Sequence, residues 1–64
     1  MYTVNDFETI FNEVMDLCGF TEWYDLYDSD YFKIVELIIT KRFGENALES
    51  EIYKDWNYEM YADL

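Results

Sequence analysis

Apolar residues recur at helical spacing near the start of the chain. One stripe of apolar side chains runs through residues 5–18 and consists of Phe7, Ile10, Phe11, Val14, Leu17 and Cys18. Spacings of three and four residues place such side chains on one face of a helix. Asn5, with Glu8 three residues later, is a capping-box start signal, and Gly19 suits the left-handed position that follows a helix. The pattern therefore predicts a helix over residues 5–18.

The most apolar stretch lies between residues 28 and 43. Its apolar side chains cover most of a helical circumference and leave only a narrow polar strip at Lys33, Glu36 and Thr40. Asp28 or Ser29 is the expected N-cap, and Gly44 follows the last apolar residue. A helix that is apolar on nearly all sides is expected to be enclosed by other elements. This helix is therefore predicted to lie at the centre of the fold.

Two further helices complete the prediction. Thr21 is the expected N-cap of a short helix that ends at Tyr27. Asn46 and Glu49 repeat the start signal of the first helix, and a last helix is expected from about residue 47 to the C-terminus. Its apolar positions are Leu48, Ile52, Tyr53, Trp56 and Met60. The sequence thus predicts one all-α domain over residues 1–64, a compact three- to four-helix bundle around a central apolar helix.

Composition supports a folded chain without covalent or metal cross-links. Of the 64 residues, 52% are hydrophobic and 22% aromatic, which is enough for a compact core and argues against disorder. The single cysteine, Cys18, lies on the first apolar stripe and is expected to be buried. An unpaired thiol fits the cytoplasm, and the N-terminus carries acids and lacks the basic region of a signal peptide. The expected state is a cytoplasmic monomer or homodimer.

Charge is the unusual property of this chain. Fifteen acidic residues face four basic ones, for a net charge of -11, and residues 1–32 contain eight acids but no Lys or Arg. A magnitude of about 2–8 is sufficient for the solubility of a small domain. Such an excess excludes direct binding to DNA, RNA or anionic membranes, whose phosphates would repel it. It points instead to a basic protein partner.

Four acids of the last helix recur every fourth residue and form one row: Glu51, Asp55, Glu59 and Asp63. Each like-charge pair at this spacing costs about 0.2–0.5 kcal/mol, so a purely structural helix would favour lysines here. The row spans roughly 18 Å, with one charge per roughly 6 Å, whereas one DNA strand carries a phosphate every ~3.4 Å. Imitation of a strand therefore needs a second acidic row. Candidates are Asp6, Glu13 and Asp16 of the first helix, or the cluster Asp25, Asp28 and Asp30. The alternative is that the acids only solubilise the protein.

Aromatic residues outside the apolar stripes are a second interface signal. Tyr58 and Tyr61 lie off the stripe of the last helix, and Trp23, Tyr24 and Tyr27 lie in the short second helix. Exposed Tyr and Trp provide large, rigid contact areas at interfaces. Trp56 and Phe11 are assigned to the core instead. We expect Tyr58 and Tyr61 to contact the partner.

Catalytic and metal-binding patterns are not found. The chain has no histidine, which is the commonest general base, and no glycine-rich phosphate loop. Asp25, Asp28 and Asp30 do not match a calcium loop, because the position that needs a bidentate Glu is occupied by Ile39. We therefore expect no enzymatic activity, no cofactor and no metal.

Residues 28–44, DSDYFKIVELIITKRFG, resemble the helix of acyl carrier proteins that begins with Asp-Ser-Leu and continues through Val-Glu-Leu to Phe-Gly. That resemblance implies phosphopantetheine attachment at Ser29. The sequence departs from the motif at Asp30, which replaces the leucine, and Val35-Glu36-Leu37 lies two residues too far from Ser29. A helix N-cap serine is the favoured interpretation of Ser29.

In length, acidity and aromatic content, the whole chain resembles the small acidic proteins that phages and mobile elements deploy against host nucleic-acid enzymes. These are anti-CRISPR proteins, antirestriction proteins and uracil-DNA glycosylase inhibitors. The resemblance implies a DNA mimic that blocks a Lys/Arg-lined nucleic-acid site of a host CRISPR effector or restriction enzyme, in the host cytoplasm. The alternative is a helical protein–protein adaptor or antitoxin.

Overall fold

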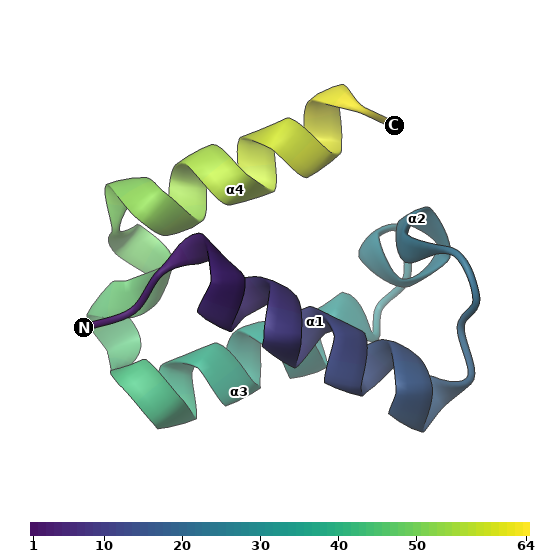
Figure 1. Cartoon of the computed structure of the whole chain (residues 1–64), viewed down its shortest axis with the longest axis horizontal. Coiled ribbons are helices and arrows are strands. Elements are labelled where there is room, and N and C mark those ends of the chain that lie inside the picture. The colour runs from purple at the N-terminus through teal and green to yellow at the C-terminus, as the bar shows by residue number, and fades with distance from the viewer.

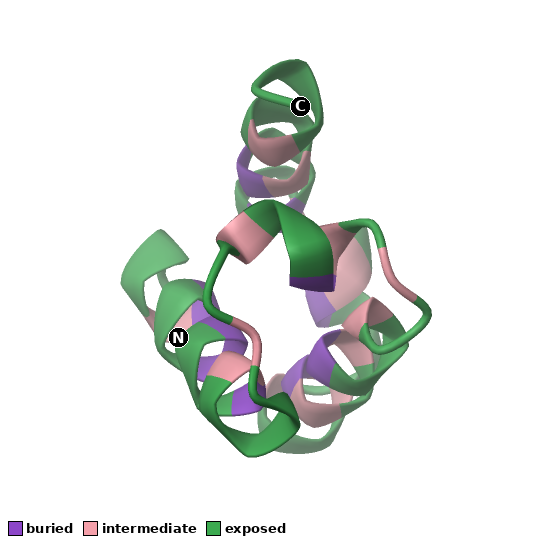
Figure 2. Cartoon of the chain, turned by 90° about the vertical axis from the view of Figure 1, so that its right-hand side faces the viewer, coloured by how far each residue is buried: buried purple, intermediate pink, exposed green.

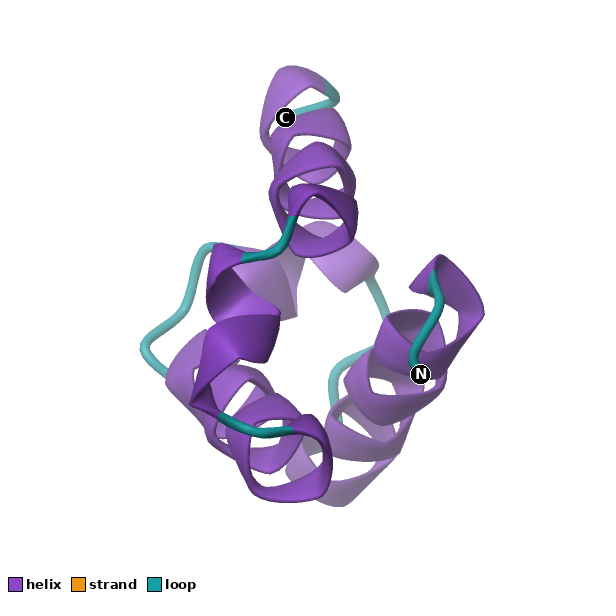
Figure 3. Ribbon diagram, turned by 90° about the vertical axis from the view of Figure 1, so that its left-hand side faces the viewer, coloured by secondary structure: helices purple, strands orange, loops and turns teal.

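The computed structural model describes all 64 residues, and its secondary structure is helical throughout. The elements are α1 (Val4–Cys18), α2 (Trp23–Tyr27), α3 (Phe32–Phe43), the 3-10 helix η1 (Glu45–Glu49) and α4 (Glu51–Ala62). In Figure 1, α1 and α3 lie side by side, α4 runs above them from η1, and α2 lies at the opposite end from η1. Figure 3 shows the same separation of α4 from the other helices, and no strand. The prediction of a small all-α bundle is confirmed.

α1 ends where the sequence predicts but begins earlier. Its N-cap is Thr3 rather than Asn5, and the backbone N–H of Thr3 donates a hydrogen bond to Oδ2 of Asp6 at 2.8 Å. A capping box thus exists, two residues before the predicted one. At the other end, Gly19 has a φ of 77°, and its N–H donates to the carbonyl of Met15. The left-handed backbone explains the glycine.

The segment between α2 and α3 is a turn in which Ser29 has a structural part. α2 begins after Glu22, rather than after Thr21 as predicted. The Ser29 hydroxyl donates to the carbonyl of Leu26 at 2.8 Å and accepts from the N–H of Tyr31 at 3.2 Å. α3 begins at Phe32, and its N-cap is Tyr31 rather than the predicted Asp28 or Ser29. It ends at Gly44, which has a φ of 98°, as expected.

The predicted last helix is two elements. Residues 45–49 form η1, and Ser50 then adopts an extended backbone with a ψ of 153°. The Ser50 hydroxyl accepts a hydrogen bond from the N–H of Tyr53 at 3.2 Å, which makes it the N-cap of α4. The prediction of one continuous helix from about residue 47 was therefore wrong. Asn46 and Glu49 resemble the start signal of a helix, but the residue that caps α4 is Ser50.

α1 supplies four of the ten core residues, more than any other element, and four of the ten are aromatic. The ten buried residues are Phe7, Ile10, Phe11, Val14, Leu26, Val35, Ile39, Ala47, Tyr53 and Trp56. In Figure 2 the buried segments of the helices face a common interior. The Phe7 ring lies 5.6 Å from the ring of Tyr53 and 5.5 Å from that of Trp56, so it joins α1 to α4. The prediction that Phe11 and Trp56 belong to the core is confirmed.

Two expectations about burial were wrong. α3 is not enclosed at the centre of the bundle, because Leu37 is 65% exposed and Ile34 is also exposed. Only Val35 and Ile39 of this helix are buried. Cys18, expected in the core, is exposed together with its neighbour Leu17. The apolar stripe of α1 is therefore buried from Phe7 to Val14 but not in the last turn of the helix.

Candidate binding surface

The four acids of α4 all lie on the exposed part of the helix. We refer to Glu51, Asp55, Glu59 and Asp63 as the α4 acidic row. Tyr53 and Trp56 are buried against the bundle, whereas all four acids of the row are exposed. Glu51 is the first residue of α4, where the positive end of the helix dipole stabilises an acid, and Asp63 is the C-cap, where an acid is disfavoured. None of the four is within ion-pair distance of a base.

Tyr58 and Tyr61 lie on the same helix and point outward. Tyr58 is 69% exposed and Tyr61 is 67% exposed. Neither phenol forms a hydrogen bond to another part of the chain. Each ring therefore offers apolar area and a free hydroxyl to a partner, which is the exposure that the sequence predicts for these two tyrosines.

The second predicted group of acids, Asp25, Asp28 and Asp30, surrounds the end of α2. All three residues are exposed, and none is paired with a base. The end of α2 is tied to α4 by the hydroxyl of Tyr27, which donates to Oδ1 of Asn57 at 2.8 Å. This bond connects the element that bears the aspartates to the middle of α4. The aspartates and the α4 acidic row therefore lie on two elements that a side-chain hydrogen bond joins.

The acids of α1 are less available as a second row. Asp6 is only partly exposed and accepts the hydrogen bond from Thr3 described above. Glu13 forms the one ion pair of the structure, with 3.2 Å between its Oε2 and the Nη2 of Arg42 on α3. Of the three, only Asp16 is exposed and unpaired. Of the two candidate second rows, only the Asp25, Asp28 and Asp30 cluster has all three of its acids exposed and unpaired.

Charge is unevenly distributed over the helices. Three of the four bases, Lys33, Lys41 and Arg42, belong to α3, which carries a single acid. α1, α2 and the turn after α2 contain no base at all, and α4 contains only Lys54. Figure 1 places α3 and α4 on opposite sides of the molecule. The outward face of α4 is therefore strongly negative, whereas α3 is locally positive.

A buried phenol links α3 to α4. Tyr53 is 4% exposed, and its hydroxyl donates to Oε2 of Glu36 at 2.6 Å. Burial, and after it this hydrogen bond, raise the pKa of Tyr53 well above its ordinary value of 10.0. The pKa of Tyr27 is also raised, mainly by burial. Both phenols remain neutral at physiological pH and act as hydrogen-bond donors rather than as acids.

Tyr53→Phe is expected to lower the free energy of unfolding by about 1–2 kcal/mol at neutral pH, because it removes a hydrogen bond to a charged acceptor. As the pH rises into the alkaline range, the free energy of unfolding of the variant should also fall less steeply than that of wild type. The unfolded phenol loses its proton near pH ~10. Because the folded phenol retains its proton there, the stabilisation is complete below that pH and is lost as the pH rises further. Urea unfolding at pH about 8 and about 11 tests this. If wild type and variant lost the same free energy of unfolding between these two pH values, the prediction would be contradicted.

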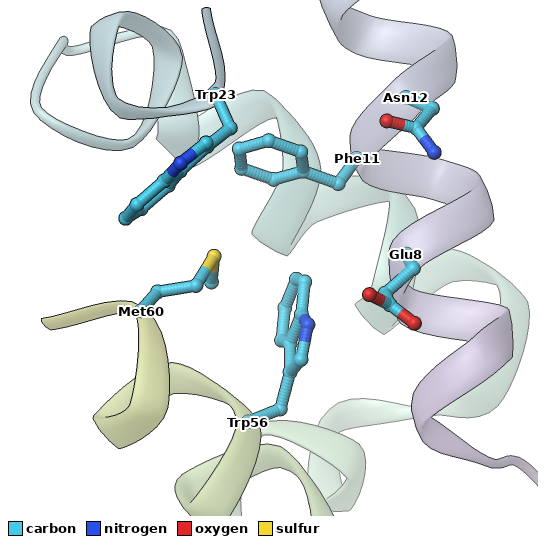
Figure 4. A pocket seen from close by; sticks show the side chains of 6 residues that line it. All are labelled: Glu8, Phe11, Asn12, Trp23, Trp56 and Met60. Carbon is cyan, nitrogen blue, oxygen red and sulfur yellow. The ribbon is translucent and has the colours of Figure 1, made fainter. Parts of the chain in front are cut away.

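The structure also contains a pocket that the sequence did not indicate. It has a volume of about 270 Å³ and lies where α1, α2 and α4 approach one another. Figure 4 shows its lining residues, Glu8, Phe11, Asn12, Trp23, Trp56 and Met60. The sequence assigned Phe11 and Trp56 to the core, and it placed Trp23 among the aromatic residues outside the apolar stripes. No sequence pattern brings these three aromatic rings together.

Ser29 and the acidic side chains bear on two other candidate chemistries, phosphopantetheine attachment and metal binding. The Ser29 hydroxyl is half-buried and already hydrogen-bonded at both sides, as a turn-forming serine would be. No group of three or more acidic, cysteine or histidine side chains is arranged to hold a metal ion. None of the helices combines the length and apolar character needed to cross a membrane. Comparisons with family models, curated proteins and solved structures found no match.

Proposed function

We propose that this protein is a non-enzymatic inhibitor that presents carboxylates in place of nucleic-acid phosphates. The partner would be a Lys/Arg-lined nucleic-acid site, such as that of a host CRISPR effector or restriction enzyme. The observation that carries the proposal is the α4 acidic row, which is exposed and unpaired over the full length of a capped helix. Like charges at this spacing destabilise a helix, so the row has a cost for folding that binding would offset.

The spacing of the charges supports the use of two acidic elements. The row alone provides one charge per roughly 6 Å, about half the density of phosphates along one DNA strand. The aspartate cluster of residues 25, 28 and 30 adds three unpaired carboxylates on the element bonded to α4 through Tyr27 and Asn57. Together the two groups provide seven exposed carboxylates, none of them paired with a base. A groove that follows a phosphate backbone would meet several acids of this protein at once.

Binding would follow from charge complementarity. The negative face attracts a positive groove at long range and accelerates association. Ions held at the groove are released on binding, which makes the affinity depend strongly on salt. Tyr58 and Tyr61, next to the acids on α4, would add apolar contact area.

Affinity capture from a bacterial lysate tests this proposal. The immobilised protein is expected to retain nucleic-acid enzymes at about 0.1 M salt and to release them at about 1 M, where the screening length falls from ~10 Å to ~3 Å. Duplex DNA should also release them, because it competes for the same groove. Purified CRISPR effectors and restriction enzymes are then assayed for DNA binding with and without the protein.

Two outcomes would contradict the proposal. Captured proteins that resist both high salt and DNA would point to an adaptor or antitoxin that binds through its aromatic surface. Captured proteins with no nucleic-acid site would exclude phosphate mimicry directly. The expected result requires salt release, DNA release and competitive loss of DNA binding by the same purified partner.

A further inference from the structure

The pocket between α1, α2 and α4 combines an aromatic interior with an acidic rim. Trp23, Trp56 and Phe11 provide three aromatic rings, and Met60 completes the apolar lining. The rings of Phe11 and Trp56 pack edge to face, with their centroids 6.1 Å apart and an interplanar angle of 87°. Figure 4 shows Trp23 and Met60 on the side of the pocket opposite Glu8 and Asn12. An aromatic enclosure of this kind favours a cation that can lie against ring faces.

The polar groups at the rim have no partners within the chain. Glu8 and Asn12 are exposed, and neither side chain forms a hydrogen bond or an ion pair. Both offer acceptor oxygens beside the rings. No basic residue lines the pocket, and three of the four bases lie on α3. A positively charged ligand would therefore find an acceptor and no competing charge.

The size and shape of the pocket suit one particular cation. A volume of about 270 Å³ corresponds to roughly nine water molecules at ~30 Å³ each. The seven non-hydrogen atoms of an arginine side chain fit in this space with room for water. A guanidinium group is planar and weakly hydrated, so it stacks on indole rings and forms paired hydrogen bonds with a carboxylate. The compact, strongly hydrated ammonium of lysine satisfies fewer of these contacts.

We propose that this pocket receives an arginine side chain from the basic partner, with the guanidinium between the aromatic rings and the Glu8 carboxylate. The inference rests on the proposed function for the source of the arginine. The pocket lies beside the α4 acidic row, because Glu59 and Asp63 each follow a lining residue, Trp56 and Met60, by three positions and are its neighbours on the helix surface. An arginine from the groove that contacts the row therefore reaches the pocket without a second docking site.

Small analogues test the pocket without the partner. Nα-acetyl-arginine amide is titrated into the intact protein and compared with Nα-acetyl-citrulline amide, which has nearly the same shape but no charge. Trp23 and Trp56 are the only two tryptophans, and both line the pocket, so their indole N–H resonances report occupancy. The arginine analogue is expected to shift both signals saturably and to bind about tenfold more tightly than the citrulline analogue.

Charge variants show whether the Glu8 carboxylate contributes to binding of the arginine analogue. Glu8→Gln should weaken binding of the arginine analogue about threefold and leave the citrulline analogue unchanged. Asp16→Asn is the matched control, because it removes one exposed acid of the same helix that does not line the pocket. It should bind the arginine analogue like wild type. Equal binding of the two analogues, shifts at only one indole, or equal effects of the two variants would overturn the proposal.

The two proposals fail in different ways. If the arginine analogue binds as expected but no captured enzyme is released by DNA, the proposal that the pocket binds arginine stands and phosphate mimicry is rejected. If enzymes are captured and released by salt and DNA but the analogue does not bind, the acidic surface acts without this pocket. If both proposals hold, Glu8→Gln should reduce affinity for a purified target enzyme more than Asp16→Asn does.

Discussion

Phe7→Ala is expected to leave most of the protein unfolded at room temperature. Phe7 is fully buried, and its ring lies within 5.6 Å of the rings of Tyr2, Tyr53 and Trp56. Removal of such a ring costs about 3–5 kcal/mol, because the lost burial is accompanied by a cavity. A domain of this size, without disulfide or metal, rarely has more than about 3–5 kcal/mol in total. One substitution therefore removes nearly all of the stability.

Far-UV circular dichroism and urea titration at 25 °C provide the measurement. Leu17→Ala is the matched control, because it truncates an apolar residue of the same helix that is 81% exposed. It should change the free energy of unfolding by less than about 0.5 kcal/mol. A cooperative transition in Phe7→Ala within about 1 kcal/mol of wild type would show that the aromatic cluster is not the main source of stability.

Asp55→Lys is expected to change stability and partner binding in opposite directions. Asp55 lies between Glu51 and Glu59 at the four-residue spacing, so the substitution converts two repulsive pairs into two attractive ones. The gain should be about 1 kcal/mol, or roughly 5 °C in Tm for a domain of this size. Opposite a positive groove, the same lysine introduces repulsion in the middle of the row. Affinity for a captured nucleic-acid enzyme should fall at least about tenfold.

Asp16→Lys separates the local effect from the change in net charge. It makes the same change of two charge units, and it lies near the C-terminal end of α1, where a base is favourable. Its stability should rise slightly, and its affinity should fall far less than that of Asp55→Lys. Calorimetric Tm and titration with the purified partner measure both quantities. Equal losses of affinity would mean that the acids act only through total charge, and unchanged affinity in Asp55→Lys would remove the α4 acidic row from the interface.

Helical content and the exposure of the α4 acidic row follow from the sequence alone. Helix ends at Gly19 and Gly44 are local events, because a positive φ depends on the residue itself and on the turn before it. Periodicity likewise placed Trp56 in the core and Tyr58 and Tyr61 outside it, since one buried stripe determines which side chains point away. All of these are interactions between residues a few positions apart.

Contacts between distant elements were decided only by the tertiary structure. The bonds Tyr27–Asn57, Arg42–Glu13 and Tyr53–Glu36 join residues 30, 29 and 17 positions apart, and no periodic pattern encodes such pairs. The same holds for the exposure of Leu37 and Cys18, because a stripe is buried only as far as another helix extends over it. The pocket is the clearest case. Its rings come from three helices, and the angles at which those helices pack, rather than the composition of any one, leave the space between them.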